Sequence, residues 1–335
     1  MPCTSWMPPF NVHRTPDHNG SRILPRRAAE TYADQGQVKS RVQTRPGSEA
    51  GSTSAPLPRF YLAALALGLA ALIGALYWTI LRDLGRQWLS DGNYGHGFLV
   101  PPFSAFLLWR QRERLRALSP RGVAVGLVVV IAGAAVLMVG DIAAENFLMR
   151  SSLIVILAGL VLFHLGPEVL KVVAFPLGFL LFMVPLPASL LYAITFPLQN
   201  LAATQAAWLL DLLGIPVLLD GNVIHLAQIS LGVTEACSGI RSLISLLAGA
   251  VAWAYLMLPA GIIAIVFVLS AVPITILANA GRVVATGLIG QWLGIEYATG
   301  FFHDLAGWVV YAFAFACLTA VHTLLVRIRP ATRSA

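Results

Sequence analysis

Long apolar segments alternate with short polar segments along most of the chain. A transmembrane helix needs about 20 apolar residues to cross the ~30 Å hydrocarbon core of a bilayer. The segments of that length are residues 60–80, 122–140, 172–190, 239–258, 261–280 and 305–326. Two shorter segments, residues 151–166 and 94–109, are further candidates, and a tilted or partly re-entrant course fits either of them. The pattern therefore predicts an all-α polytopic membrane protein with about eight transmembrane helices.

Residues 191–214 have a helical pattern that polar side chains interrupt. A further crossing here would place the C-terminal Arg cluster opposite the N-terminal arm, so we interpret this segment as an interfacial or bundle-packed helix. Two short apolar runs follow, residues 217–219 and 223–226, and they flank Asp220-Gly221-Asn222. Because Gly readily adopts the positive φ of a tight hairpin turn, the pattern predicts a small extracytoplasmic β-hairpin.

The basic residues indicate an orientation, because Lys and Arg accumulate on the cytoplasmic side of membrane proteins. With a cytoplasmic N-terminus, 17 of the 22 Lys and Arg residues fall in cytoplasmic segments. We therefore predict that both termini are cytoplasmic. Residues 1–58 are predicted to be a disordered arm, residues 59–327 the membrane domain and residues 328–335 a short basic tail.

Composition supports a membrane protein and excludes other classes. The chain is 58% hydrophobic and 11% charged, with a mean hydropathy of +0.77, whereas about a quarter of the residues in soluble proteins are charged. The net charge of +7 comes mostly from Arg at the ends of apolar runs, so we expect no nucleic-acid partner. Three cysteines, Cys3, Cys237 and Cys317, are too few for a disulfide framework.

Three residues capable of chemistry lie at span ends on the same side of the membrane. Cys237 precedes the span that starts at residue 239, Arg282 follows the span that ends near residue 280, and His303 precedes the last span. The predicted topology places all three at the outer interface.

These residue types fit thiol chemistry on a peptide bond. A thiol at a helix N-terminus is more readily ionised, a cation can stabilise the oxyanion, and a His can protonate the leaving amine or act as the base. Each residue also has an ordinary explanation: a small packing Cys, an Arg anchored at the interface, and a His with an interfacial hydrogen bond. By spacing alone, the trio is weak evidence for catalysis.

The sequence around these residues resembles the exosortase/archaeosortase family. The matching stretches are Glu235-Ala236-Cys237-Ser238-Gly239-Ile240-Arg241-Ser242-Leu243, Asn279-Ala280-Gly281-Arg282-Val283 and His303-Asp304-Leu305-Ala306-Gly307-Trp308, with Tyr94-Gly95-His96-Gly97-Phe98-Leu99-Val100-Pro101 earlier in the chain. The block around Cys237 is the most specific of them.

The resemblance implies a membrane-embedded cysteine protease/transpeptidase with Cys237, Arg282 and His303 as catalytic residues. Cys237 would form a thioester with exported proteins that carry a C-terminal tripartite signal of the PEP-CTERM type. Such a signal has a Pro-containing motif, a transmembrane helix and a basic tail. Water or an amine would accept the acyl group. The resemblance also implies a bacterial inner-membrane enzyme that faces the periplasm and is linked to exopolysaccharide production. We expect membrane lipid around it and no cofactor or metal.

Four further residues are candidates for supporting or substrate-binding roles. Glu235 would oppose thiolate formation next to Cys237, so it points away, pairs with an Arg or contacts substrate. Ser238 lies in the same stretch. His96 lines the substrate entrance or makes an interfacial structural bond. Asn279 orients Arg282 or a backbone group, or it forms a bond between helices.

A different class of function is a non-enzymatic membrane subunit or transporter for polysaccharide export. That hypothesis predicts internal repeats, broken helices and ionisable residues within spans. No internal repeat is visible, and the polar residues gather at one interface, which favours the enzyme.

Overall fold

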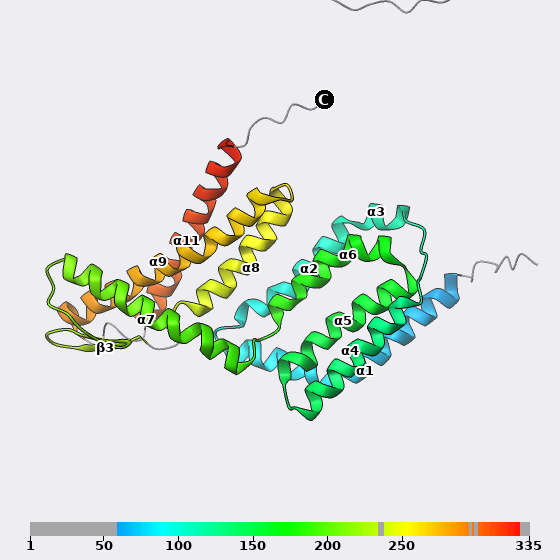
Figure 1. Ribbon diagram of the computed structural model, residues 1–335, viewed down its shortest axis with the longest axis horizontal. Coiled ribbons are helices and arrows are strands. Elements are labelled where there is room, and N and C mark those ends of the chain that lie inside the picture. The colour runs from blue at the N-terminus through cyan, green and yellow to red at the C-terminus, as the bar shows by residue number, and fades with distance from the viewer. Residues whose placement is uncertain (1–58, 234–237, 295–296, 298–300, 329–335) are drawn as a thin grey trace, which may run out of the picture. The chain divides into compact units, whose positions relative to one another are not determined.

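The computed structural model describes residues 59–233, 238–294, 297 and 301–328, which form helices and one small sheet (Figure 1). The longer helices are α1 (Arg59–Ser90), α4 (Val125–Ile142), α5 (Asn146–His164), α7 (Ala188–Leu212), α8 (Ile240–Met257), α9 (Ile262–Leu293) and α11 (Phe301–Ile328). The shorter elements are the 3-10 helices η1 (Gly95–Leu99) and η2 (Leu180–Met183) and the helices α2 (Val100–Arg110), α3 (Arg112–Ala117) and α6 (Pro167–Phe179).

The predicted all-α polytopic fold is confirmed. Among the described residues, six helices are long and apolar enough to cross a membrane, and there are seven spans if α6–η2 and α7 count as one bent crossing. The predicted number was about eight spans, and the difference arises in residues 94–109 and 172–190. The first segment forms η1 and the 11-residue α2, and the second forms the 13-residue α6 with η2. None of these helices alone has the length of a span.

Helices α1, α5 and α9 are longer than their apolar segments suggested. Helix α9 continues to Leu293, so Arg282, which was predicted to follow the end of a span, lies inside this helix. Beyond residue 80, α1 continues because Leu84 and Trp88, four residues apart, pack in a core cluster with residues of α5, α6 and η2. Helix α5 begins at Asn146 and includes Arg150, which is buried. A charge that the sequence places at a span end thus lies inside the helix.

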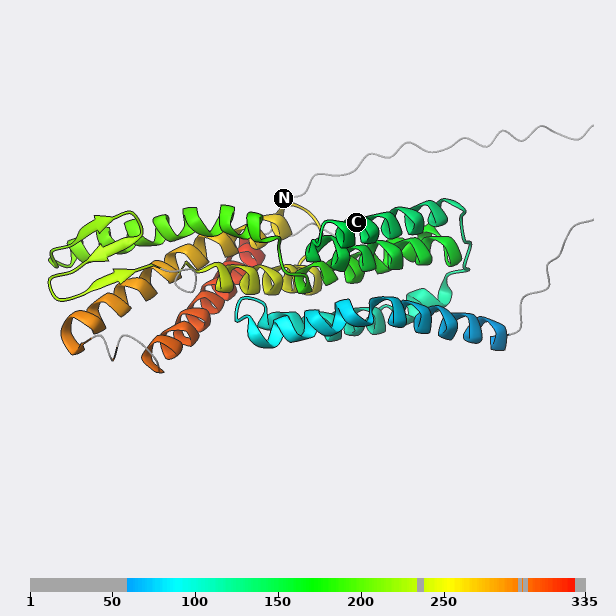
Figure 2. The ribbon, with the colours of Figure 1, turned by 90° about the horizontal axis from the view of Figure 1, so that it is seen from below.

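The chain bends by 76° between α6–η2 and α7. Pro185 and Pro187 lie in the connection, where neither can donate a backbone hydrogen bond to continue a helix. Figures 1 and 2 both show α7 alongside α9, and its buried face includes Ala202, Ala203 and Ala206. The segment predicted as an interfacial or bundle-packed helix therefore packs through small side chains.

The predicted hairpin is present and forms part of a three-stranded antiparallel sheet with the order β1 (Leu218–Asp220), β2 (Val223–His225), β3 (Ser230–Gly232). Sequence analysis missed β3, whose three residues are too few to show an alternating pattern. Asn222 fixes its end, since its backbone oxygen accepts from the Val233 N–H at 2.8 Å and its Nδ2 donates to the Val233 oxygen at 2.9 Å. Ile224 of β2 packs on Leu210 of α7 and Val283 of α9, so these elements share a core.

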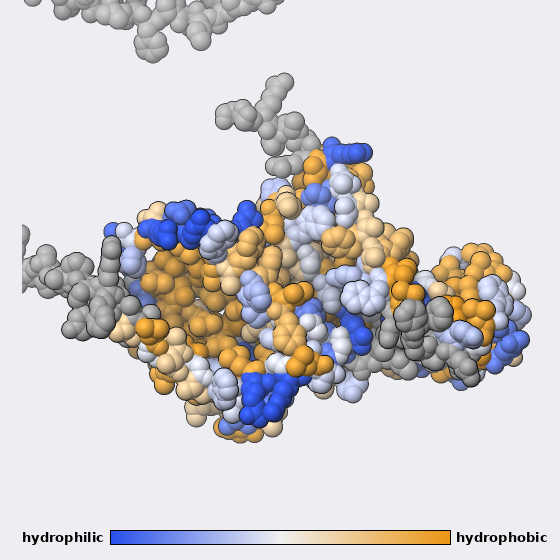
Figure 3. Space-filling model, turned by 180° about the vertical axis from the view of Figure 1, so that it is seen from behind, coloured by the Kyte–Doolittle hydropathy of each residue, from blue (hydrophilic) through white to orange (hydrophobic). Residues whose placement is uncertain are grey.

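A second core joins α8, α9 and α11 through residues such as Leu246, Phe267 and Leu318. Helices α4 and α5 approach closely at Gly126, where a Cβ would lie 2.2 Å from the Phe163 nitrogen. Large hydrophobic side chains, among them Ile131, are exposed on the outside. Seen from behind, they form a broad apolar surface with hydrophilic side chains at its edges, as expected for a protein surrounded by lipid (Figure 3).

Candidate active site

A defined turn leads into the N-terminus of α8. Gly239 has φ +85°, in the left-handed region that residues with a Cβ rarely adopt. Ser238 is 4% exposed, and its Oγ accepts a hydrogen bond from the Ile240 N–H over 3.3 Å. A Cβ at position 239 would lie 2.9 Å from Cγ of Asn279, so this turn also packs tightly on α9. In the sequence, Cys237 comes directly before this turn.

Helix α9 presents Asn279 and Arg282 on one face, because residues three apart are neighbours on a helix. Asn279 is 2% exposed and abuts Gly239. The Arg282 guanidinium extends to α11, where its Nη2 would lie 3.7 Å from a Cβ at Gly307. Helix α9 thus connects the start of α8 with the first turns of α11.

The first turns of α11 also contain His303. Gly307 follows it by four residues, which is about one helical turn, or roughly 6 Å along the axis. The backbone of His303 therefore lies about one turn from the point where Arg282 meets α11. The side chain of His303 and all of Glu235 and Cys237 lie outside the described residues.

A cleft of about 410 Å³ lies where η1, α8, α9 and α11 meet. It is lined by His96, Arg241, Ser242, Ser245, Arg282, Gly307, Trp308 and Tyr311. The structure thus brings Arg282 and His96 to one cleft, although 186 positions separate them in the chain. Ser238 and Asn279 lie beside it, at the turn into α8.

Backbone groups of the bend between α6 and α7 hold η1 and the residues around it in position. His96 Nε2 lies 3.1 Å from the Phe182 carbonyl oxygen, Trp88 Nε1 donates to the Met183 oxygen at 3.0 Å, and the Leu186 N–H donates to Tyr94 Oη at 3.2 Å. The side chains of Trp88, Tyr94 and His96 thus supply hydrogen-bond partners to backbone groups that the bend exposes.

The charged side chains among the described residues that line the cleft are basic. Arg241 and Arg282 both line it, and the Arg241 guanidinium lies against Gly92, where a Cβ would be 2.6 Å from its Nη2. His96 lies outside the six candidate spans, and burial lowers its pKa, an effect that hydrogen bonds to the Phe182 and Asn93 backbones partly oppose. His96 is therefore neutral near pH 7, and the two guanidinium groups are suited to a carboxylate or a developing oxyanion.

Sequence analysis considered Arg241 only as a pairing partner of Glu235, and it assigned no role to five other lining residues: Ser242, Ser245, Gly307, Trp308 and Tyr311. Arg241, Ser242 and Ser245 lie at positions i, i+1 and i+4 of the otherwise apolar α8. This short polar stripe is a signal that could have identified a cleft-facing side. Trp308 and Tyr311 have no comparable pattern, because aromatic residues are common in the first half of α11.

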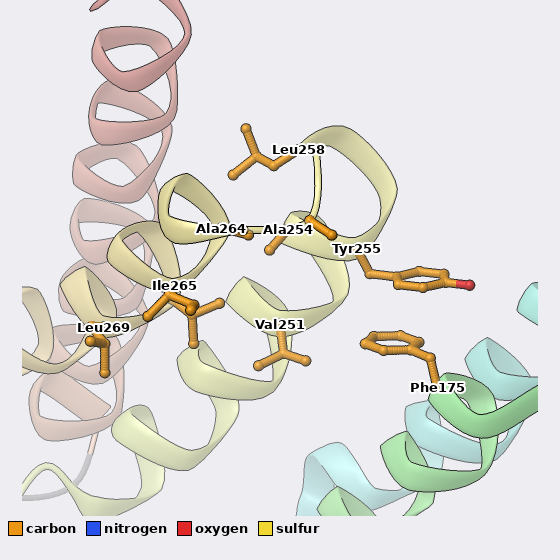
Figure 4. Close-up of a pocket in the computed structure, with 11 residues that line it drawn as sticks. Phe175, Val251, Ala254, Tyr255, Leu258, Ala264, Ile265 and Leu269 are labelled. Atoms are coloured by element: carbon orange, nitrogen blue, oxygen red, sulfur yellow. The ribbon is translucent and has the colours of Figure 1, made fainter. Parts of the chain in front are cut away.

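A second cleft, of about 500 Å³, lies between α6, α8 and α9 (Figure 4). Its lining is apolar apart from the Tyr255 hydroxyl, and the Tyr255 ring stacks on Phe175 at 3.6 Å. Ala254 and Tyr255 belong to the last turn of α8, about 21 Å along the axis from its start. This apolar cleft suits hydrocarbon and has no group that could act on a peptide bond.

The described part of the chain contains no group of three or more His, Cys, Asp or Glu side chains that could hold a metal ion. The chemistry available at the polar cleft comes from its guanidinium, imidazole and hydroxyl groups. Together with a thiol at the start of α8, such groups could carry out acyl transfer.

One of the comparisons with known proteins identifies a family. The family model described as transmembrane exosortase matches residues 88–320. The match runs from the last turn of α1 into α11 and includes every residue that lines the polar cleft. No curated protein and no solved structure matches the chain.

Proposed function

The chain belongs to the transmembrane exosortase family, and from this we propose that it is a membrane-embedded cysteine protease/transpeptidase that cleaves the C-terminal sorting signal of exported proteins. The observation that carries the proposal is the polar cleft, where Arg282 of α9 meets α11 one turn from His303. The same cleft is lined by the start of α8, the helix that Cys237 precedes.

In the proposed reaction, the Cys237 thiolate attacks the scissile carbonyl carbon and forms a tetrahedral oxyanion. Arg282 stabilises this charge, and the N-terminus of α8 favours the thiolate. The C–N bond then breaks as His303 gives a proton to the leaving amine, which leaves a Cys237 thioester. Water or an amine attacks the thioester, loses a proton to His303 and regenerates the thiolate.

The charges of the molecule support the proposed substrate and orientation. A PEP-CTERM-type signal has an acidic, Pro-containing motif next to a transmembrane helix, and Arg241 and Arg282 give the cleft a complementary charge. The six candidate spans, an even number, support a position of both termini on one side; with that side cytoplasmic, the cleft faces the periplasm at the bacterial inner membrane. A substrate whose basic tail stays cytoplasmic presents its motif at this level. The link to exopolysaccharide and surface-protein production belongs to the same proposal.

The test is co-expression with a protein that carries a tripartite C-terminal signal. We expect Cys237→Ala to remain in the membrane at wild-type abundance and to leave the substrate at full length on immunoblots. Cys317→Ala is the matched control, because it removes the thiol in α11 and should leave processing intact. Mass spectrometry of substrate trapped on the enzyme would identify the attached residue and the cleavage site. Undiminished processing by Cys237→Ala would reject the proposal.

A further inference from the structure

A third cleft, of about 470 Å³, lies between α1, α4 and α5, away from the candidate active site. Its lining residues are Leu76, Thr79, Ile80, Asp83, Leu137, Met138, Asp141, Asn146, Met149 and Arg150. The four from α1 follow a spacing of three and four residues, so they share one face of that helix. The helix ends that frame this cleft are the end of α1 next to η1, the end of α4 and the start of α5.

Arg150 provides a buried positive charge in this cleft. The residue is 5% exposed, and its Nη1 donates to Gln87 Oε1 at 2.6 Å. Among the described residues, its Nε has no hydrogen-bond partner, and its guanidinium forms no ion pair with a carboxylate. Burial of a cation is costly unless an anion accompanies it. The carboxylates of Asp83 and Glu145 act on this charge from beyond ion-pair distance. The cleft therefore offers an unused N–H donor and a cation that an anion in direct contact would stabilise further.

The rim of the cleft has the opposite charge. Asp83 and Asp141 are exposed and lie near the ends of α1 and α4, whereas Arg150 lies one turn inside α5 from Asn146. Asp83 also forms an exposed ion pair with Arg86 at 3.4 Å, which contributes little to the free energy of folding. The lining thus combines two exposed carboxylates with one buried guanidinium.

Apolar side chains continue the cleft away from the rim. Leu76 and Ile80 of α1 face Leu137 and Met138 of α4, and both helices are candidate membrane spans. A ligand that fills the cleft would therefore meet carboxylates, a buried cation and hydrocarbon-like walls. Phospholipids with an ammonium group carry the three complementary kinds of group: an ammonium, a phosphate and acyl chains.

We propose that this cleft binds a phospholipid whose head group contains a phosphate and a primary ammonium, as in phosphatidylethanolamine. The phosphate accepts hydrogen bonds from Arg150, the ammonium donates to Asp83 and Asp141, and an acyl chain lies along Leu76 and Ile80. Charge-assisted hydrogen bonds of this kind are the stronger ones. The proposal stands apart from peptide cleavage, since none of these residues lines the polar cleft.

Native mass spectrometry of the full-length protein in detergent tests the proposal with three lipids that have the same acyl chains. We expect phosphatidylethanolamine to bind more tightly than phosphatidylcholine, whose ammonium cannot donate, and than phosphatidylglycerol, which has no cation. Arg150→Gln should weaken phosphatidylethanolamine binding by about tenfold or more. Asp83→Asn and Asp141→Asn should each weaken it about two- to fivefold. The matched control is Asp220→Asn, an exposed carboxylate on β1 that should change nothing.

Three results would overturn the assignment. The first is equal binding of the three lipids. The second is an unchanged preference in the Asp83→Asn/Asp141→Asn double variant, which alters only exposed side chains and remains decisive if Arg150→Gln does not fold. The third is displacement of the lipid by soluble O-phosphoethanolamine at equal concentration, because the apolar walls would then contribute nothing. Substrate processing is not read in this experiment, so its outcome is independent of the proposed protease activity.

Discussion

Replacement of Gly239 by Ala tests whether the turn into α8 positions the catalytic groups. The residue has φ +85°, and a Cβ there would lie 2.9 Å from Cγ of Asn279. The left-handed conformation costs a residue with a Cβ about 1–2 kcal/mol. Carbon atoms in contact prefer about 3.5–4.0 Å, so one of the two groups must move by roughly 0.6 Å or more. Because Asn279 is buried, overpacking adds about 1–3 kcal/mol.

We therefore expect Gly239→Ala to lower the free energy of unfolding by about 2–5 kcal/mol and to displace the turn that follows Cys237. A misplacement approaching 1 Å can reduce an enzymatic rate about 100-fold. Processing of a co-expressed substrate, timed by pulse-chase, measures the rate, and thermal unfolding in detergent measures stability. Gly249→Ala is the matched control in the same helix, since nothing lies within 4 Å of its Cβ position. Wild-type processing and an unchanged Tm in Gly239→Ala would refute the reasoning.

Three further predictions concern neighbouring contacts. Gly97→Ala should lower the Tm measurably, because its Cβ would lie 2.4 Å from Trp88 Nε1 and would break the hydrogen bond to the bend. Gly307→Ala should process substrate normally, since its Cβ would make an ordinary 3.7 Å contact with Arg282 Nη2, whereas Gly307→Val should displace the guanidinium and slow cleavage about tenfold or more. Burial lowers the pKa of His96 below 6.5, so the folded state binds fewer protons than the unfolded state. Stability should therefore fall as the pH drops from about 6.5 through the folded-state pKa. In measurements of the Tm against pH, His96→Gln should remove this dependence.

Each of these predictions has a control or a contrary result. Gly95→Ala, in the same 3-10 helix as Gly97 and with nothing within 4 Å, should leave the Tm unchanged. Equal rates of substrate cleavage by Gly307→Ala and Gly307→Val would show that cleavage does not depend on the position of the Arg282 guanidinium against α11. A pH dependence of the Tm that persists in His96→Gln would assign it to other groups.

The sequence alone determined the elements whose cause is local. A run of about 20 apolar residues must form a helix to satisfy its backbone in lipid, so α4, α8 and α11 lie close to their predicted positions. Asp220-Gly221-Asn222 specified the turn of the first hairpin through the conformational freedom of glycine. The motif stretches, moreover, indicated the family that the family model shows.

Tertiary packing decided what depends on residues far apart in the chain. The length of α1 and the inclusion of Arg150 in α5 follow from partners on other helices, which no apolar run records. The same holds for the position of His96, which reaches the Arg282 cleft because the bend between α6 and α7 presents backbone carbonyls to η1. A sequence records which groups need partners, and only the folded chain decides which partners they meet, because hydrogen bonds and side-chain packing act over a few ångströms.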